Sequence, residues 1–319
     1  MIVATKKKRE LEILALSGGV GGAKLVKGLS HVLGGSCLSV VVNTGDDFDF
    51  HGLCVCPDLD TVMYALAGLQ DETRGWGIAG ETWDALDMMG RYGEDTWFQL
   101  GDRDLATHIV RTALLRKGLS LSEATERLSR GLGVSACLFP MSDDVVSTWV
   151  DTPEGELPFQ DYFVRRRAEP EVLGCRLEGI EEASPSPGFV ESLDRAEVVV
   201  IAPSNPVVSI APILALPGIR DGLRSSKAVK IAISPIVAGR ALKGPAVEML
   251  LAVGVRPTSS GVAEQYSDFL DVFLLDQQDS ESAASIQEMG MATIITDTVM
   301  RTEEDKIRLA REIMEFVGV

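Results

Sequence analysis

The stretch Ile13-Leu14-Ala15-Leu16-Ser17-Gly18-Gly19-Val20-Gly21-Gly22-Ala23 decides the fold of this chain. Four apolar residues, typical of a buried strand, run directly into a serine and four glycines. A helical pattern with leucine and valine on one side then covers Ala23–Val32. A second apolar run, Leu38–Val42, follows at once. Strand, glycine turn, helix and strand in this order predict a parallel sheet.

The apolar runs share one property, because each ends at a small, hydroxyl-bearing or acidic cluster. We expect six such strands: Ile13–Leu16, Leu38–Val42, Val198–Ala202, Val229–Ile233, Val272–Leu275 and Ala292–Ile295. In an open α/β sheet, ligands bind just beyond the carboxyl ends of the strands. Glycine, hydroxyl and carboxylate groups at that edge suit a phosphate ester together with a metal ion.

The predicted fold class is α/β, with a doubly wound, mainly parallel, Rossmann-like sheet in a single domain over residues 1–319. A mixed helical and β subdomain is expected as an insertion over about 71–190. The expected helices are Thr61–Leu69, Trp83–Tyr92, Leu105–Lys117, Ser122–Leu132 and Glu303–Phe316, and the strands of the insertion are Val134–Phe139, Val145–Val150 and Phe159–Val164. Asp104 is expected to cap the helix that starts at Leu105.

Composition limits the classes of partner. With 319 residues and 45% hydrophobic composition, the chain can bury one large core or two modest ones. Its net charge of −17 argues against nucleic acid and against acidic lipid surfaces, because both need a positive protein surface. An anionic substrate bridged by a divalent cation stays compatible with this charge.

Cysteine usage and the chain start predict a cytoplasmic protein. The five scattered cysteines do not form a disulfide framework, and Cys54 and Cys56 are too close for the usual zinc spacing. The basic run Lys6–Arg9 precedes acidic residues rather than an apolar segment, so it does not predict a signal peptide. No stretch approaches the length of a membrane span.

The glycine loop matches neither familiar nucleotide fingerprint. Lys24 stands where a dinucleotide motif needs its third glycine, and Ala23 and Leu25 flank that lysine where a Walker motif needs glycine and serine or threonine. Backbone N–H groups between a strand and a helix still favour an anion, so we expect phosphates over Gly18, Gly19, Gly21 and Gly22. The alternative is a tight turn without a ligand.

Acidic residues gather after the second strand. Asp46 and Asp47 end it, and Asp58 and Asp60 follow in the string Pro57-Asp58-Leu59-Asp60-Thr61. One carboxylate would suffice for a ribose hydroxyl, whereas several suit a hard cation. An alternative role for Asp60 is to cap the helix that follows it.

Other candidates are residues with polar or aromatic groups at loop and helix ends. Arg103 stands between two aspartates and offers a fork for phosphate or for a structural ion network. Trp76 borders a glycine-rich loop and could cover a flat heterocycle, although core packing is the commoner use. Ser204 and Asn205, between two prolines, project from a strand end or simply form a turn. His108 is expected to be a packed or hydrogen-bonded histidine rather than a base.

Seven strings in order carry a resemblance over about Leu11–Thr302. They are Ser17–Lys24, Asn43–Asp47, Cys56–Thr61, Gly101–His108, Pro140–Asp144, Pro203–Pro206 and Ser234–Ile236. Together they closely resemble the 2-phospho-L-lactate transferase family (CofD, also called FbiA). The rival readings are a YvcK-like, nucleotide-sugar-binding regulator and, more distantly, a Rossmann dehydrogenase, which the failed glycine fingerprint disfavours.

The resemblance implies a transferase of coenzyme F420 biosynthesis. It would move 2-phospholactate or phosphoenolpyruvate from a guanylyl diphosphate donor to the ribityl hydroxyl of the deazaflavin Fo, releasing GMP with the help of Mg²⁺. We expect a homodimer. The site residues assigned on this basis are Asp46 and Asp60 for catalysis; Asp46, Asp58 and Asp60 for the metal; Asp58, Asp60, Arg103 and Trp76 for Fo; and Gly18, Gly19, Gly21, Gly22, Ser204, Asn205, Ser234 and Thr296 for the nucleotide.

Overall fold

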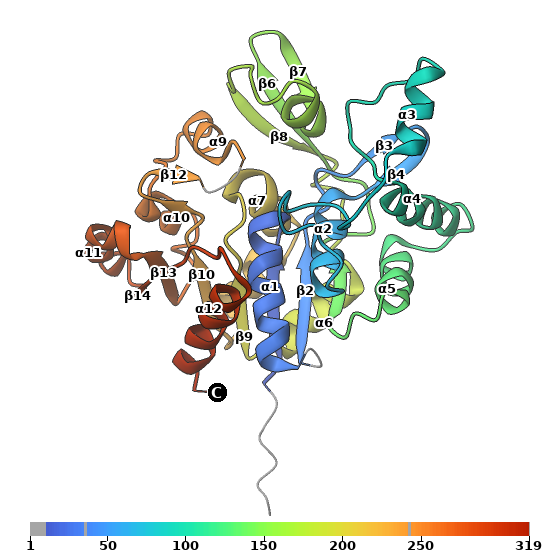
Figure 1. Cartoon of the computed structure of the whole chain (residues 1–319). Coiled ribbons are helices and arrows are strands. Elements are labelled where there is room, and N and C mark those ends of the chain that lie inside the picture. The colour runs from blue at the N-terminus through green and yellow to red at the C-terminus, as the bar shows by residue number, and fades with distance from the viewer. Residues whose placement is uncertain (1–10, 35–36, 242–243, 319) are drawn as a thin grey trace, which may run out of the picture.

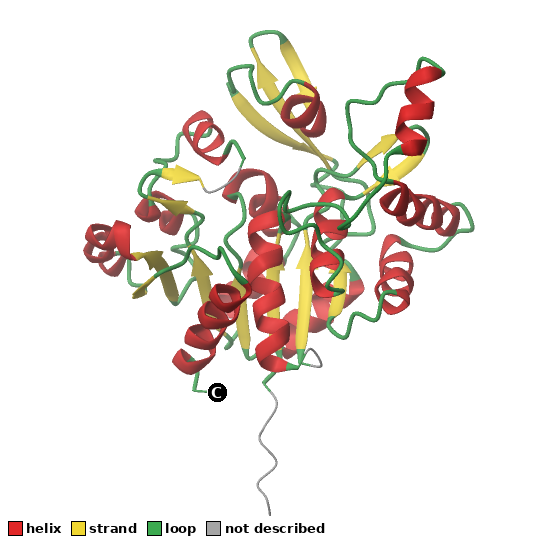
Figure 2. Ribbon diagram, viewed as in Figure 1, coloured by secondary structure: helices red, strands yellow, loops and turns green. Residues whose placement is uncertain are grey.

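A computed structural model describes residues 11–34, 37–241 and 244–318. Within them, one main sheet has seven parallel strands in the order β14-β13-β10-β9-β1-β2-β5 (Figure 2). These strands are β1 (Ile13–Ser17), β2 (Leu38–Val42), β5 (Cys137–Pro140), β9 (Val198–Ile201), β10 (Val229–Ile233), β13 (Val272–Asp276) and β14 (Ala292–Thr296). The chain starts in the middle and builds outward in both directions, which confirms the doubly wound architecture. The point where the strand order reverses lies between β1 and β9.

Alternation along the strands builds two cores. In β1, Ile13 and Ala15 face one core and Leu14 and Leu16 face the other. The first core is covered by α1 (Val20–Leu33), α2 (Pro57–Leu66) and α12 (Glu303–Phe316). The second is covered by α6 (Pro187–Arg195), α7 (Ala211–Ala215), α8 (Ile219–Ser225), α9 (Ala246–Ala252), α10 (Ser259–Glu264) and α11 (Ala283–Glu288).

Two groups of elements lie beyond the carboxyl ends of the strands, at the end of the molecule where α1 begins (Figure 1). The first comprises β3 (Phe48–Phe50), β4 (Leu53–Val55), α3 (Asp84–Arg91) and α4 (Asp102–Leu115). The helix that follows, α5 (Leu121–Gly131), instead packs beside β5 at the edge of the main sheet. The second is a small antiparallel sheet of β6 (Ser147–Thr152), β7 (Gly155–Pro158) and β8 (Gly174–Glu178), with the π-helix η1 (Asp161–Arg165). The remaining elements are η2 (Pro206–Ile210), β11 (Ile236–Val237), β12 (Arg240–Ala241) and η3 (Gln277–Ser282).

The structure differs from the expected insertion at 71–190 in one respect. β5 lies inside that range, yet it pairs in parallel with β2 as the edge strand of the main sheet. The inserted material therefore comes in two parts, one before β5 and one after it.

Two local predictions were wrong. Phe159–Val164 was expected to be a strand, but Asp161–Arg165 forms a helical turn, and Phe159 stacks on Phe163 with ring centroids 5.5 Å apart. The apolar residues there recur at helical spacing. Asp104 does not cap α4, because that helix begins earlier, after the N-cap Gly101.

In the described part of the chain, no single helix is long and apolar enough to cross a membrane. One pair bent by 81°, Pro206–Ala215 with Ile219–Ser225, passes the test by length and composition alone. The run Lys6–Arg9 lies outside the described residues.

Candidate active site

The glycine loop and the turn after β9 meet at the point where the strand order reverses. The Gly18 N–H donates a hydrogen bond to Ser204 Oγ at 2.9 Å. A side chain at Gly21 would collide with the Pro203 carbonyl oxygen, and one at Gly22 with the Ser17 and Ser204 hydroxyls. These glycines therefore let α1 start in direct contact with the end of β9.

A carboxylate of the protein already occupies part of this loop. The Gly19 N–H and the Ser209 hydroxyl both donate to the Asp58 carboxylate, and a Cβ at Gly19 would collide with it. The first intrahelical bond of α1 is donated by Ala23 to the Gly19 carbonyl. The amides available to a phosphate are consequently those of the first turn of α1, over residues 20–22, rather than those of Gly18 and Gly19.

Asp46 and Asp58 share one amide. Asn43 Nδ2 donates to Asp46 Oδ1 and to Asp58 Oδ2, both at 3.0 Å, and Gln160 Nε2 donates to Asp46 Oδ2 at 2.9 Å. Burial, with the negative charges of Asp58 and Asp47, raises the pKa of Asp46 well above its ordinary value, and burial raises the pKa of Asp58 to about 6. Two buried carboxylates whose hydrogen-bond donors are all neutral have no positive charge beside them, so a bound cation would be stabilised there.

Asp60 points into a second cluster, between α2 and α4. Arg111 Nη1 donates to Asp60 Oδ2 at 3.0 Å, and its other terminal nitrogen bonds to Oδ1. His108 lies between Asp60 and Asp104, with Nδ1 3.6 Å from Asp60 Oδ2 and Nε2 3.2 Å from Asp104 Oδ1. Tyr64 donates its hydroxyl to Asp104 Oδ1 at 2.7 Å. Asp60 therefore does not cap α2, whose N-cap is Cys56.

This second cluster has the residue types of a metal site, but it also contains a positively charged side chain, Arg111. The ligand atoms of Asp60, Asp104 and His108 lie within 4.8 Å of one another. However, the Arg111 guanidinium, only 1% exposed, already bonds to both oxygens of Asp60. The cluster is thus a buried ion network that holds Asp60 in place.

Asp47 links the two clusters. The Cys56 thiol hydrogen-bonds to its carboxylate, whose Oδ1 is buried and without a hydrogen-bond partner. Burial raises the pKa of Asp47 well above its ordinary value, and the charges of Arg111 and Asp60 also act on it. Its unpartnered oxygen is the kind of buried polar atom that functional sites retain.

The string Gly101–Asp104 forms a reciprocal cap between α3 and α4. Asp102 accepts hydrogen bonds from the N–H groups of Asp84 and Ala85 at the start of α3. Glu81 in turn accepts from the N–H groups of Arg103 and Asp104 at the start of α4. Asp102 and Glu81 therefore have structural roles at the two helix starts. The Arg103 side chain is exposed and donates a hydrogen bond to the Ala79 carbonyl at 3.1 Å.

Trp76 lies on an ordered loop. Gln70 pairs with Ile78 and donates its side-chain amide to the Gly75 carbonyl at 2.8 Å. The Arg74 guanidinium lies 5.6 Å from the Trp76 ring centroid and 4.8 Å from that of Trp83. The ring that could cover a flat ligand is thus already stacked with a cation.

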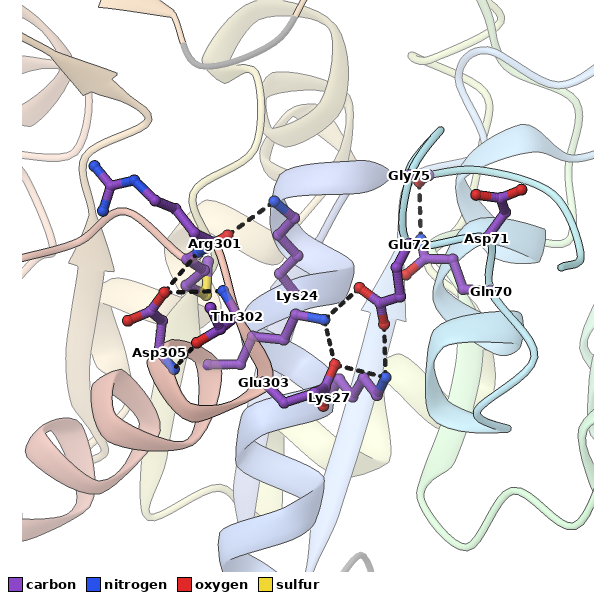
Figure 3. A network of polar contacts seen from close by, with 12 residues as sticks. Lys24, Lys27, Gln70, Asp71, Glu72, Gly75, Arg301, Thr302, Glu303 and Asp305 are labelled. Atoms are coloured by element: carbon purple, nitrogen blue, oxygen red, sulfur yellow. Dashed lines mark hydrogen bonds and ion pairs between the residues drawn. The ribbon is translucent and has the colours of Figure 1, made fainter.

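Figure 3 shows what holds this loop in place. Glu72, on the loop, bonds to Lys27 of α1 at 2.8 Å and to Lys306 of α12 at 2.7 Å, and Glu303 of α12 contacts both lysines. The network ties the loop to the helix that carries the glycine turn. Lys24, one turn earlier in α1, donates to the Met300 carbonyl at 2.9 Å.

The sequence model of a family described as 2-phospho-L-lactate transferase CofD matches residues 13–314. The chain belongs to the CofD family.

Proteins similar to this CofD-family chain carry two names. The 2-phospho-L-lactate transferase of Methanosarcina mazei is 41% identical over 303 residues, which cover 95% of this chain and 99% of that protein. The phosphoenolpyruvate transferase of Nocardia farcinica is 40% identical over 320 residues, covering 96% and 95%. A UPF0052 family protein of Bacillus halodurans shares the fold, with a TM-score of 0.64 at 15% identity and coverage of 96% and 99%.

The predicted nucleotide residues of the CofD-family chain fall into two groups. Ser204 lies at the glycine loop, and Asn205 beside it accepts from the Val207 and Val208 N–H groups and so caps η2. Ser234 instead hydrogen-bonds to Ser259 and the Ile236 carbonyl, and Thr296 donates to Glu312 at 2.6 Å. Since β14 is four strands from β1, Thr296 lies about 19 Å away from the loop.

Several residues of the site were not predicted. Arg111 follows Asp104 and His108 at helical spacing on the buried face of α4, a signal that the sequence did contain. Asn43 precedes the acidic cluster, and its role as the shared donor depends on α2 returning to it. Gln160 lies 114 residues from Asp46 and had no local signal.

Proposed function

We propose that this CofD-family transferase moves a phospho-acyl group, 2-phospholactate or phosphoenolpyruvate, from its guanylyl diphosphate donor to the terminal ribityl hydroxyl of Fo, releasing GMP, in coenzyme F420 biosynthesis. A relative named 2-phospho-L-lactate transferase and one named phosphoenolpyruvate transferase are about equally identical to this chain. We therefore propose both phospho-acids as candidates for the transferred group. The observation that carries it is the buried pair Asp46 and Asp58 beside the glycine loop at the strand reversal.

Mg²⁺ is the proposed cofactor, and the residues present fit it. Asp46 and Asp58 are buried, and the side chains that donate to them, Asn43, Gln160 and Ser209, are neutral. One or two carboxylates completed by substrate oxygens are the usual Mg²⁺ ligands. Asp60 was proposed as a third ligand from the sequence, but both of its oxygens bond to Arg111. We therefore propose Asp46 and Asp58 as the principal ligands.

When bound there, the metal would neutralise charge on the donor's phosphates. The chain's own part is positioning. The first-turn amides of α1 face the phosphates, and Asp60, held by Arg111, faces the side from which the acceptor hydroxyl approaches. Arg103, at the start of α4, and Trp76, on the loop before α3, are the residues proposed to orient Fo. The proposed step is in-line attack of the ribityl hydroxyl on the donor phosphorus, with GMP as leaving group.

The test is a product assay with the purified protein. Incubation with Fo, Mg²⁺ and each guanylylated acid in turn should yield GMP and a phosphodiester of Fo, resolved by chromatography and mass spectrometry. The rates with the two acids decide which donor is used. Lack of product with both donors, together with no thermal stabilisation by Fo, would reject the proposal in favour of a binding protein.

A homodimer and a cytoplasmic location belong to the same proposal. Light scattering during gel filtration should give twice the 34.3 kDa of one chain. A mass of one chain would remove the dimer from the proposal without affecting the chemistry.

A further inference from the structure

Cys54 and Cys56 form a close pair of thiols at the start of the helix that carries the acidic residues. Cys54 lies in β4 and Cys56 is the N-cap of α2, directly before Pro57. Residues two apart in extended backbone point to the same side. The two Sγ atoms accordingly lie 3.7 Å apart.

The two thiols differ in access. Cys54 is partly exposed, whereas Cys56 is fully buried and hydrogen-bonds to Asp47. The contact with the Cys56 sulfur lowers the pKa of Cys54 to about 7, and the Arg111 charge acts in the same direction. The accessible thiol is therefore the more reactive one, with a second thiol within reach of it.

We propose that Cys54 and Cys56 are a reversible redox pair that forms an internal disulfide when a peroxide reaches Cys54. The Cys54 sulfur attacks one peroxide oxygen, the O–O bond breaks, and water leaves, giving a sulfenic acid. The Cys56 sulfur then attacks the Cys54 sulfur, the S–O bond breaks, and a second water leaves with the Cys56 proton. Two thiols lose two electrons and two protons, and the peroxide is reduced to two waters.

The disulfide would disturb the site described above. Closing the 3.7 Å gap to a covalent S–S bond draws Cys56 away from Asp47 and moves the first turn of α2. Asp58 and Asp60 both lie in that turn. Oxidation should therefore lower the transfer rate, a consequence that rests on the proposed function.

The chemistry is testable without an activity assay. The protein is treated with hydrogen peroxide, its remaining thiols are alkylated, and it is cleaved with chymotrypsin, because cleavage after Phe50 separates the pair from Cys37. The peptide containing both residues should lose two hydrogens and resist alkylation until dithiothreitol is added. Two alkylated thiols, or over-oxidised Cys54 without a link to Cys56, would overturn the proposal.

The effect on the site is measured with the same samples. Oxidised protein should transfer at least about tenfold more slowly, with full recovery after reduction. Cys54→Ser should keep the basal rate and resist peroxide, whereas Cys175→Ser, on β8, should stay sensitive. If Cys54→Ser does not fold, Cys54→Ala serves. A linked peptide with an unchanged rate would overturn the effect on the site, and an inactive reduced protein would instead refute the proposed function.

Discussion

Arg111 holds Asp60 by both carboxylate oxygens, with Nη1 3.0 Å from Oδ2 and the second terminal nitrogen bonded to Oδ1. The two side chains come from α4 and α2 and are 1% and 4% exposed. A bidentate pair fixes the plane of the carboxylate as well as its position. Asp60 therefore has a fixed position and orientation within its buried cluster.

Removing one member of this pair should be costly. Arg111→Met leaves the Asp60 charge buried without its cation and should lower the free energy of unfolding by about 3–5 kcal/mol. Urea unfolding followed by circular dichroism measures it. Arg127→Met, at an exposed position on α5, is the control. The double variant Asp60→Leu with Arg111→Met should regain most of the stability but no transfer activity; an unstable double variant would contradict this account.

Asp46 is the residue whose loss should affect catalysis most directly. Asp46→Asn keeps the size of the side chain but removes a charge from the proposed Mg²⁺ site, and the transfer rate should fall by about two orders of magnitude or more. Steady-state kinetics over a range of Mg²⁺ concentrations measures the effect. Asp49→Asn, at an exposed position three residues further along the chain, should retain the parental rate. A parental rate for Asp46→Asn would remove this residue from the site.

Substitution of Arg103 should affect the binding of the two substrates differently. The exposed Arg103 side chain lies at the start of α4, where we propose that Fo binds, so Arg103→Ala should weaken Fo binding by about tenfold or more and leave GDP binding unchanged. Calorimetric titration with each ligand measures both affinities, and Arg91→Ala, exposed on α3, is the matched control. Loss of GDP binding alone would show that the two halves of the site are reversed.

Stability should depend on pH through Asp58. Burial raises its pKa from 3.8 to about 6, so the folded protein binds this proton more tightly than the unfolded chain. Its contribution to stability is therefore greatest below pH of about 4 and falls as the pH rises to about 6. In metal-free buffer at pH 8, Asp58→Asn should raise the free energy of unfolding by roughly 2 kcal/mol.

The same two proteins test the metal site. Adding Mg²⁺ at pH 8 should stabilise the parent by mass action and stabilise Asp58→Asn much less. Thermal unfolding with and without Mg²⁺ measures the difference. An equal response of both proteins would place the metal elsewhere.

The anchor of the Trp76 loop gives a pH dependence of the opposite sign. Burial alone would raise the pKa of Glu72, but hydrogen bonds from Lys27 and Lys306 lower it from 4.5 to about 2. Its contribution is present above pH of about 4.5 and is lost as the pH falls to about 2. Since the side chain is half exposed, Glu72→Gln should cost about 1 kcal/mol at pH 7. Exposed Glu304→Gln should cost nothing, and a cost for Glu72→Gln that persists at pH 2 would contradict this account.

The sequence predicted the central strands closely because their apolar runs are short and end sharply. Leu38–Val42 and Val229–Ile233 have the predicted bounds. The sheet membership of β5 was not predictable in the same way, because its pairing with β2 depends on residues almost 100 positions apart. Phe159–Val164 failed because six residues with four apolar ones fit a strand and a helical turn equally well.

For the candidate site, the sequence predicted which acidic residues lie there but not that Asp58 and Asp60 belong to two different clusters. Asp58 and Asp60 are two residues apart on α2, and the helical rotation sends one to the glycine loop and the other to Arg111. Phosphates were expected over Gly18, Gly19, Gly21 and Gly22. Instead, the Ser204 hydroxyl and the Asp58 carboxylate accept hydrogen bonds from the first two amides, which only tertiary contact could determine.

The packing of α12 on α1 has a consequence for synthesis of the protein. Lys27 and Glu303 contact each other across 276 residues of chain, and a side chain at Gly28 would collide with the Lys306 carbonyl. The helix that follows the glycine loop is thus covered by a segment that is synthesised 276 residues later. Until that segment has been made, the apolar face of α1 is open to chaperones and to misassembly, so the part of the fold around β1 should be completed only after α12 has been synthesised.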